Sequence, residues 1–124
     1  MLKSYIFIFM LFAHCIGDYI LQKDFISKAK RKSFWLNIKD EKVDTFAYLS
    51  ILCVHAFIWS FCIHLPLILF LPQSNIIVVS IFINFLIHGI IDDLKANRNK
   101  ISMTIDQLIH VLQIVITYIL FIVL

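Results

Sequence analysis

Apolar residues along this chain gather in four long stretches, at about residues 2–22, 45–65, 76–93 and 103–124, and polar residues gather between them. A helix needs roughly 20 apolar residues to cross a bilayer, at about 1.5 Å per residue. Each stretch therefore predicts one membrane-spanning helix. Pro66 is expected to kink or end the second helix, and Pro72 begins a short turn before the third.

The composition supports a membrane protein. Hydrophobic residues make up 61% of the 124 residues and charged residues 15%, whereas a soluble domain has about 45–50% apolar and about 25% charged residues. This excludes a water-soluble enzyme domain, and the two glycines exclude a Gly-rich phosphate loop. We expect an all-α fold, a polytopic four-helix bundle in one domain over residues 1–124. Cys15, Cys53 and Cys62 lie in apolar runs without C-x-x-C spacing, which favours packing roles over disulfides or a zinc ribbon.

Basic residues are distributed unevenly between the two sides of the predicted bundle. The loops 23–44 and 95–102 hold ten of the eleven Lys and Arg residues, and Lys3 alone lies on the other side. Because cytoplasmic loops carry an excess of Lys and Arg, we expect both basic loops in the cytoplasm and both termini outside. The first stretch contains His14 and Asp18 and lacks a small-x-small cleavage site, so we expect it to stay in the protein as a membrane helix.

Ionisable residues stand inside the predicted helices, where they are costly and usually mark a functional site. Six of them form three pairs spaced four apart, which places both members of a pair on one helix face. The set is His14 with Asp18, His88 with Asp92, Asp106 with His110, and the single His55.

The depths of these residues predict that they share one site. Counted from the nearest basic loop at about 1.5 Å per residue, the histidines of the four helices lie roughly 10–16 Å deep, in one layer. Each paired aspartate lies one turn nearer the basic loops than its histidine. Residues placed by chance would not be expected to bring the histidines to one depth and also all three paired aspartates to the side nearer the basic loops.

Imidazoles and carboxylates together favour a divalent metal ion, with zinc first because of the share of histidine. Seven residues exceed the four ligands of one tetrahedral zinc, so either two ions are held or the surplus carboxylates act as bases and orienting partners. Our preferred assignment makes His14, His88 and His110 the core ligands and His55 a fourth. Asp18, Asp92 and Asp106 are expected to be ligands or catalytic bases.

Other polar residues near these faces suit substrate-binding or orienting roles. They are Gln22, Lys23, Asn84, Lys95 and Gln107. Lys23 and Lys28 are expected to be nearest a lipid phosphate. His64 has no aspartate four positions away and is interpreted as structural.

The spacing of these residues resembles that of a known family. The pattern His14-x3-Asp18-Tyr19-x2-Gln22, His55, His88-x3-Asp92-x2-Lys95 and Asp106-Gln107-x2-His110 is similar to that of small bacterial integral membrane proteins with a domain of unknown function, DUF3307. The resemblance covers nearly the whole chain and implies a multi-pass protein of the bacterial cytoplasmic (inner) membrane, but no activity. More loosely, the His-x3-Asp pairs are similar to those of intramembrane zinc amidases such as ceramidases and adiponectin-type receptors, an analogy of site type and not of fold.

These observations favour an intramembrane metal-dependent hydrolase that acts on a lipid or lipid-linked substrate near the cytoplasmic leaflet. One hypothesis from another class is a divalent-cation or proton transporter or carrier that uses the same ligands as a transient site. A third is a structural or partner-binding membrane subunit in which the His and Asp side chains hydrogen-bond between helices. Membrane lipids are the expected partners, nucleic acid is not, and the sequence leaves a homo-oligomer open.

Overall fold

The computed structural model describes residues 2–38, 46–72 and 74–123, and these ranges contain helices and no strand. Four long helices form the bundle: α1 (Leu2–Cys15), α4 (Ala47–Phe70), α5 (Asn75–Ala96) and α6 (Met103–Tyr118). α1 and α6 each continue as a π-helical turn, η1 (Ile16–Ile20) and η2 (Ile119–Val123). Two short helices, α2 (Asp24–Ala29) and α3 (Lys32–Leu36), lie between α1 and α4 in the chain. The predicted all-α four-helix bundle is confirmed.

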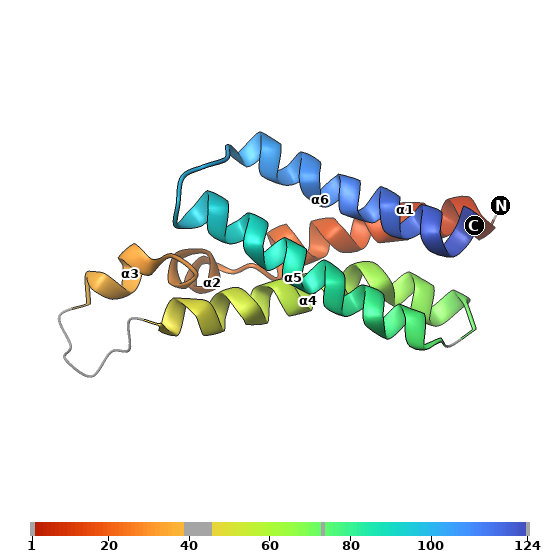
Figure 1. Cartoon of the computed structure of the whole chain (residues 1–124), viewed down its shortest axis with the longest axis horizontal. Coiled ribbons are helices and arrows are strands. Elements are labelled where there is room, and N and C mark those ends of the chain that lie inside the picture. Colours follow the sequence, from red (N-terminus) through yellow and green to blue (C-terminus); the bar gives the residue numbers. More distant parts are fainter. Residues whose placement is uncertain (1, 39–45, 73, 124) are drawn as a thin grey trace.

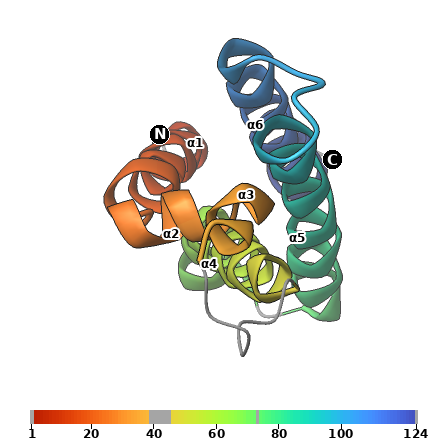
Figure 2. The same ribbon diagram turned by 90° about the vertical axis from the view of Figure 1, so that its left-hand side faces the viewer.

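The long helices run along the longest axis of the molecule, and both chain ends lie at the same end of the bundle (Figure 1). α2 and α3 lie at the opposite end, where both contact α4 (Figures 1 and 2). Lys95 near the end of α5 and the turn to α6 are also at that end. The basic segments therefore lie together, at the end away from the termini.

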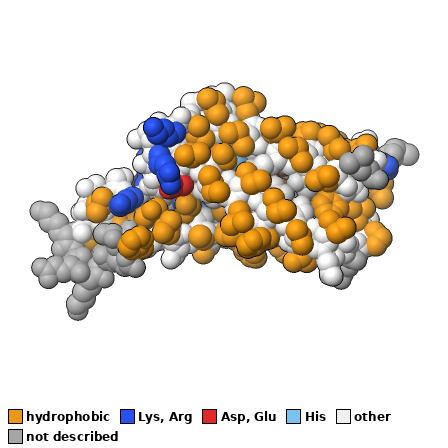
Figure 3. Space-filling view, in the orientation of Figure 1, with side chains coloured by type: hydrophobic (Ala, Val, Ile, Leu, Met, Phe, Trp, Pro, Cys, Tyr) orange, Lys and Arg blue, Asp and Glu red, His pale blue; other side chains and the backbone are white. Residues whose placement is uncertain are grey.

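Within the residues that the structure describes, four segments are long and apolar enough to cross a membrane: Leu2–Ile20, Ala47–Phe70, Asn75–Ala96 and Met103–Val123. Hydrophobic side chains cover the bundle along its length, and most of the Lys and Arg side chains visible in this view gather at the end of the bundle away from the termini, around the end of α5 and the turn to α6 (Figure 3). Such an apolar surface suits lipid tails and not water. The chain has the features of a multi-pass membrane protein.

The helix boundaries differ from the prediction in three places. Pro66 does not end the second helix, because α4 continues to Phe70 and ends before Pro72; a proline removes one backbone hydrogen bond, which membrane helices tolerate. The third helix runs to Ala96, so Lys95 is helical. The segment expected to be a loop contains α2 and α3, while its residues 39–44, and the predicted helix start at 45, lie outside the described residues.

The interior of the bundle has an apolar part and a polar part. Near the termini, the core consists of apolar side chains, with Trp59 at its inner limit: Ile6, Met10, Trp59, Ile63, Leu67, Ile114 and Ile122. Beyond Trp59, toward α2 and α3, the buried side chains are mainly histidine, aspartate and lysine. Within the described residues, the buried aspartates, the buried lysine and the buried histidines other than His64 thus lie in the half of the bundle nearer the basic end, whereas Ser60, His64 and Thr117 are buried in the other half.

Candidate metal centre

The His and Asp residues expected to share a site lie together in that polar half. Contacts of 3.3 Å to 4.0 Å between imidazole nitrogens and carboxylate oxygens join them into one cluster. All seven members are buried: His14, Asp18, His55, His88, Asp92, Asp106 and His110. We refer to these seven residues as the His/Asp cluster.

Within the cluster, Asp18, His55 and His88 present ligand atoms to one another from three helical segments. His55 Nε2 lies 3.5 Å from Asp18 Oδ1 and 3.3 Å from His88 Nε2, and His88 Nε2 lies 3.8 Å from Asp18 Oδ1. Two ligands about 2.0–2.1 Å from a tetrahedral zinc ion are about 3.3–3.4 Å apart. The triangle is close to that size, so this ligand trio could hold a metal ion.

A second group, His88, Asp92 and His110, also has ligand atoms within 4.8 Å of one another. Beside it, His110 Nε2 lies 3.4 Å from Asp106 Oδ1. Both of these atoms are buried, and neither has a hydrogen-bond partner within the described ranges. Buried polar atoms without a partner are rare in folded proteins, and when His110 is neutral with its hydrogen on Nδ1, the two facing lone pairs fit a shared cation. The residues present therefore suit a metal ion in chemistry as well as in spacing.

Asp18 reaches the trio because its segment departs from α-helical geometry. In the turn Ile16–Ile20 the Leu21 amide donates to the Ile16 carbonyl oxygen at 2.8 Å, one residue beyond the α-helical partner. Gly17 allows this turn to approach α4 closely, because a Cβ at this position would lie 3.1 Å from Trp59 Cδ1 and 3.3 Å from Trp59 Cα. This π-helical turn, a feature found frequently at functional sites, was not predicted from the sequence.

Two lysines contact the carboxylates of the cluster. Lys30 Nζ lies 2.5 Å from Asp92 Oδ2, and Lys95 Nζ lies 2.5 Å from Asp106 Oδ2 and 3.0 Å from Asp92 Oδ1. Lys95 was predicted at the site, but Lys30 was not, because in the sequence it is one of several basic residues in a row. With neutral histidines, three aspartates and two lysines leave one uncompensated negative charge in the cluster, which a cation would balance.

His14 lies in the cluster but outside both ligand groups, in contrast to its expected role as a core ligand. Trp59 Nε1 donates a hydrogen bond to His14 Nδ1 at 2.8 Å. Because an indole nitrogen only donates, His14 Nδ1 must be the accepting nitrogen, and its lone pair is not free for a metal. His55, expected as a fourth ligand, belongs to the trio, whereas His14, expected as a core ligand, belongs to neither group.

Trp59 also packs against the rings of the cluster. Its ring stacks on His88 with centroids 4.2 Å apart, and His88 stacks on His110 at 4.0 Å. Trp59 was not among the residues predicted at the site, since a tryptophan in an apolar run looks like any lipid-facing aromatic. The stack fixes the planes of the two imidazoles and closes the cluster toward the apolar core.

Asn84, which was predicted near the site, does not contact the His/Asp cluster directly. It contacts Gln113, a residue that was not predicted, and Gln113 contacts His110. Gln113 Oε1 lies 3.2 Å from His110 Nδ1, and Gln113 Nε2 lies 3.1 Å from Asn84 Oδ1. Asn84 Nδ2 in turn donates to Thr117 Oγ1 at 3.1 Å. Asn84 and Gln113 therefore orient His110 and do not contact the trio directly.

Gln107 and Gln22 contact the cluster as expected. Gln107 Nε2 donates to Asp18 Oδ2 at 3.1 Å and to Asp106 Oδ2 at 3.0 Å. With the Gln22 amide oriented to satisfy its neighbours, its nitrogen donates to the Asp18 main-chain oxygen at 3.0 Å and its oxygen accepts from Lys30 Nζ at 2.8 Å. Lys23 is exposed and has no side-chain contact within the described residues, so the structure does not bring it to the cluster.

His64 is separate from the cluster, as the sequence predicted. Its Nδ1 lies 2.7 Å from the Ser60 main-chain oxygen and its Nε2 lies 2.8 Å from Ser80 Oγ. Both ring nitrogens therefore have partners that explain a buried histidine. The cysteines are free thiols, and none belongs to either ligand group.

A polar pocket of about 390 Å³ opens beside the cluster at the basic end. The pocket is lined by Asp18, a member of the cluster, and by three residues that contact the cluster: Lys30, Lys95 and Gln107. Arg31 lines the same pocket, is exposed, and has no carboxylate partner in the described part of the chain. We call this cavity the polar pocket. It gives a small polar group a route to Asp18 from the basic end.

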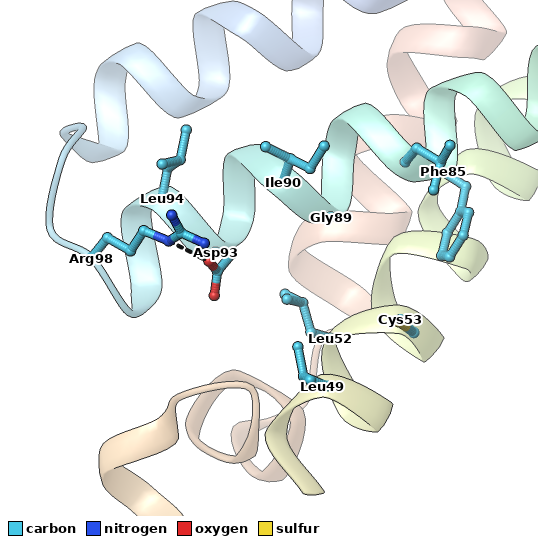
Figure 4. A pocket seen from close by; sticks show the side chains of 10 residues that line it. Leu49, Leu52, Cys53, Phe85, Gly89, Ile90, Asp93, Leu94 and Arg98 are labelled. Atoms are coloured by element: carbon cyan, nitrogen blue, oxygen red, sulfur yellow. Dashed lines mark hydrogen bonds and ion pairs between the residues drawn. The ribbon is translucent and has the colours of Figure 1, made fainter. Parts of the chain in front are cut away.

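A second cavity, of about 280 Å³, is an apolar groove between α4 and α5 (Figure 4). Leu49, Leu52 and Cys53 line it from α4, and Arg98 and Asp93 form an ion pair at one end, with Arg98 Nε 2.8 Å from Asp93 Oδ2. No member of the His/Asp cluster lines this groove. It is therefore not the access route to the cluster.

The comparisons with known proteins identify a family and no activity. The family model described as "Protein of unknown function (DUF3307)" matches residues 6–124. No curated protein and no solved structure matches the chain. A functional conclusion must therefore come from the site itself.

Proposed function

This chain belongs to the DUF3307 family, and we propose that it is a metal-dependent hydrolase that acts within the membrane on a lipid or lipid-linked substrate. One observation carries the proposal: Asp18 belongs both to the ligand trio and to the lining of the polar pocket. Metal ligands and an access route thus form one site, the arrangement expected of a catalytic centre.

The ligand trio favours zinc among the divalent ions. Two imidazoles and one carboxylate are a common set for catalytic zinc, which keeps a further position open for water or substrate. Such an ion, when bound, activates water for attack at neutral pH and polarises a carbonyl or phosphoryl oxygen.

The remaining carboxylates supply the proton chemistry in this proposal. Asp92 Oδ2 lies 3.3 Å from His55 Nε2, and Asp106 Oδ1 lies 3.4 Å from His110 Nε2. Lys30 and Lys95 stabilise the charged form of both aspartates, so either can accept a proton from the attacking water and return it to the leaving group. Asp18 acts from the pocket side as a ligand.

The polar pocket indicates what kind of substrate can enter. It opens at the basic end, which the excess of Lys and Arg favours as the cytoplasmic side of a bacterial inner membrane, with both termini outside. A head group in the cytoplasmic leaflet can reach Asp18 there, while its acyl chains stay in the bilayer. We assign contact with an anionic head group to Arg31, because its guanidinium lines the pocket and has no carboxylate partner within the described ranges.

The proposal is tested by turnover. Detergent-purified protein loaded with zinc is incubated with lipid esters, lipid amides and lipid phosphoesters, and products are identified by mass spectrometry. We expect hydrolysis within one of these classes, loss of activity in His55→Ala, and retained activity in His64→Ala, which removes a buried histidine outside the cluster. Metal-loaded protein that hydrolyses none of the three classes would contradict the proposal.

A proton carrier is the second candidate, and a hydrogen-bonded chain favours it. The chain leads from His110 through Gln113 and Asn84 to Ser80 Oγ, which is 3.4 Å from Asn84 Nδ2, and on to His64. Two amides interrupt it, and an amide does not readily give up its protons, so the chain suits orientation better than proton transfer. Proton or zinc flux into liposomes without turnover would favour the carrier.

The third candidate is a structural subunit in which the His/Asp cluster only joins helices. In that case, alanine substitutions in the cluster would lower the yield of folded protein, and the wild type would hold no metal ion and hydrolyse nothing. Stoichiometric metal in the purified wild type, lost in His88→Ala, would contradict this candidate.

A further inference from the structure

The amide of Gln113 determines which nitrogen of His110 carries a hydrogen. Gln113 Nε2 donates to the main-chain oxygen of Asn84 at 3.3 Å and to Asn84 Oδ1 at 3.1 Å, so the amide oxygen Oε1 is the atom that faces His110 Nδ1 at 3.2 Å. Because a carbonyl oxygen only accepts, His110 Nδ1 carries the hydrogen. A neutral His110 then presents a bare lone pair at Nε2.

That lone pair faces carboxylate oxygens. His110 Nε2 lies 3.4 Å from Asp106 Oδ1 and 3.9 Å from Asp92 Oδ1. His110 and Asp106 are both 0% exposed, and neither of the two facing atoms has a hydrogen-bond partner in the residues that the structure describes. Electron-rich atoms buried this close together repel each other unless a proton or a metal cation lies between them.

Asp92 connects this position with the ligand trio. Its Oδ2 lies 3.3 Å from His55 Nε2, whereas its Oδ1 is the oxygen nearer His110 Nε2. One carboxylate thus offers one oxygen to each side. In two-metal hydrolytic sites the ions are about 3.5–4 Å apart, a separation that a bridging carboxylate can span.

We propose that the cluster holds two divalent cations bridged by Asp92. The first lies in the trio of Asp18, His55 and His88, and the second lies between Asp92, Asp106 and His110. The second site deepens the proposed function and rests on the first ion being present. With both ions bound, Asp92 is a ligand through both oxygens, and Asp106 Oδ2 is the carboxylate oxygen that remains to accept a proton from the attacking water. Gln113 is a positioning residue for the second ion, since it directs the lone pair of His110 toward it.

Lys95 competes with the second ion for the same carboxylates. Its ammonium lies between Asp92 Oδ1, at 3.0 Å, and Asp106 Oδ2, at 2.5 Å. The Lys95 side chain is 21% exposed and lines the polar pocket, so it has room to turn outward when an ion replaces it. Removing the ammonium should therefore strengthen binding of the second ion. The extra positive charge of two ions would favour an anionic substrate group.

The test is the number of ions bound. Purified protein is saturated with Zn²⁺, freed of excess metal, and measured by elemental analysis, and a Mn²⁺-loaded sample is examined by electron paramagnetic resonance for coupling between two ions. We expect two zinc ions in the wild type and in His64→Ala, and one in His110→Ala and in Gln113→Leu. Gln113→Glu keeps an acceptor for His110 Nδ1–H but loses the donor to Asn84, so it should recover the second ion only partly. Lys95→Met should lower the dissociation constant of the second ion.

Each outcome has one meaning. One ion in the saturated wild type, with no coupled manganese signal, overturns the second site and leaves the proposed function standing. An unchanged count of two in both His110→Ala and Gln113→Leu also overturns it, because the second ion would then lie elsewhere. No bound ion at all overturns the second site and the proposed function together.

Discussion

Lys30 Nζ lies 2.5 Å from Asp92 Oδ2, although the two residues are 62 positions apart in the chain and both side chains are almost fully buried. Asn97, on the turn after α5, donates to the Lys30 main-chain oxygen at 3.1 Å and helps to hold the end of α2 against the bundle. A basic segment outside the long helices thus supplies a charge to the centre of the site.

Replacing this lysine should destabilise the protein. Lys30→Met leaves the buried Asp92 carboxylate with only Lys95 as a cationic partner, and breaking a buried ion pair costs about 3–5 kcal/mol. We expect the free energy of unfolding, measured in detergent, to fall by about 3 kcal/mol, the lower limit of that range. Lys28→Met, at an exposed position of α2, the short helix that ends just before Lys30, should change the free energy of unfolding by less than about 0.5 kcal/mol. Equal effects of the two substitutions would show that the Lys30–Asp92 pair contributes little.

His14 and His55 should differ in their effect on metal affinity. His55 belongs to the ligand trio, whereas His14 Nδ1 accepts a hydrogen bond from Trp59. We expect His55→Ala to weaken zinc binding at least about 100-fold, since loss of one ligand costs several kcal/mol, and His14→Ala to weaken it less than about tenfold. Competition with a chelator measures both dissociation constants. The reverse order would mean that His14 is a ligand, as the sequence spacing alone predicts.

The two glycines provide a matched pair of substitutions. A Cβ on Gly17 would lie 3.1 Å and 3.3 Å from atoms of Trp59, whereas a Cβ on Gly89 would lie 3.5 Å from Ala56 Cβ, an ordinary contact. Gly17→Ala should cost about 1–3 kcal/mol through overpacking and should weaken zinc binding by displacing Asp18. Gly89→Ala should be neutral or stabilising by up to about 1 kcal/mol, because alanine favours a helix. Thermal unfolding and zinc titration test both; a harmless Gly17→Ala would contradict the close approach of the π-helical turn to α4.

Arg31 should recognise an anionic head group in the polar pocket. Arg31→Gln and Lys28→Gln each remove one positive charge from the same surface, but only Arg31 lines the pocket. A charge-assisted hydrogen bond contributes about 1.5–3 kcal/mol, so Arg31→Gln should weaken binding of a short-chain lipid phosphate at least about tenfold. Lys28→Gln should have little effect. Calorimetry with the lipid phosphate and with inorganic phosphate separates head-group binding from binding of the free anion, and equal losses in both variants would indicate general surface attraction only.

Much of the fold and part of the site follow from the sequence. Four apolar stretches of membrane-spanning length leave few arrangements other than a bundle, and a spacing of four places His88 with Asp92, and Asp106 with His110, on single helix faces. Depth along the helices also predicts which histidines meet. These features depend on helix geometry alone, and the structure agrees with them.

The parts that the sequence did not predict depend on contacts between segments. Lys30 and Lys23 look equivalent as basic residues after the first helix, and only the path of α2 makes Lys30 buried and leaves Lys23 exposed. The exclusion of His14 from the trio requires the indole of Trp59, one turn from His55 on α4, to reach across to α1. The spacing of residues along the chain predicts neither contact.

Gln113 is a further residue whose role could not be predicted from the sequence. It is three positions from His110 and could have been considered for that reason, but a glutamine in an apolar run gives no indication of what its amide faces. Its importance comes from Asn84 on the neighbouring helix, which fixes the direction of the amide.

The metal content of the purified protein tests the central claim most directly. Elemental analysis is made on detergent-purified wild type beside His88→Ala, which removes the residue shared by both ligand groups, and His64→Ala, which removes a buried histidine outside them. We predict stoichiometric zinc or another divalent metal in the wild type and in His64→Ala, and its loss in His88→Ala. A wild type without bound metal, or a His88→Ala protein with unchanged metal content, would contradict the claim that the His/Asp cluster is a metal centre.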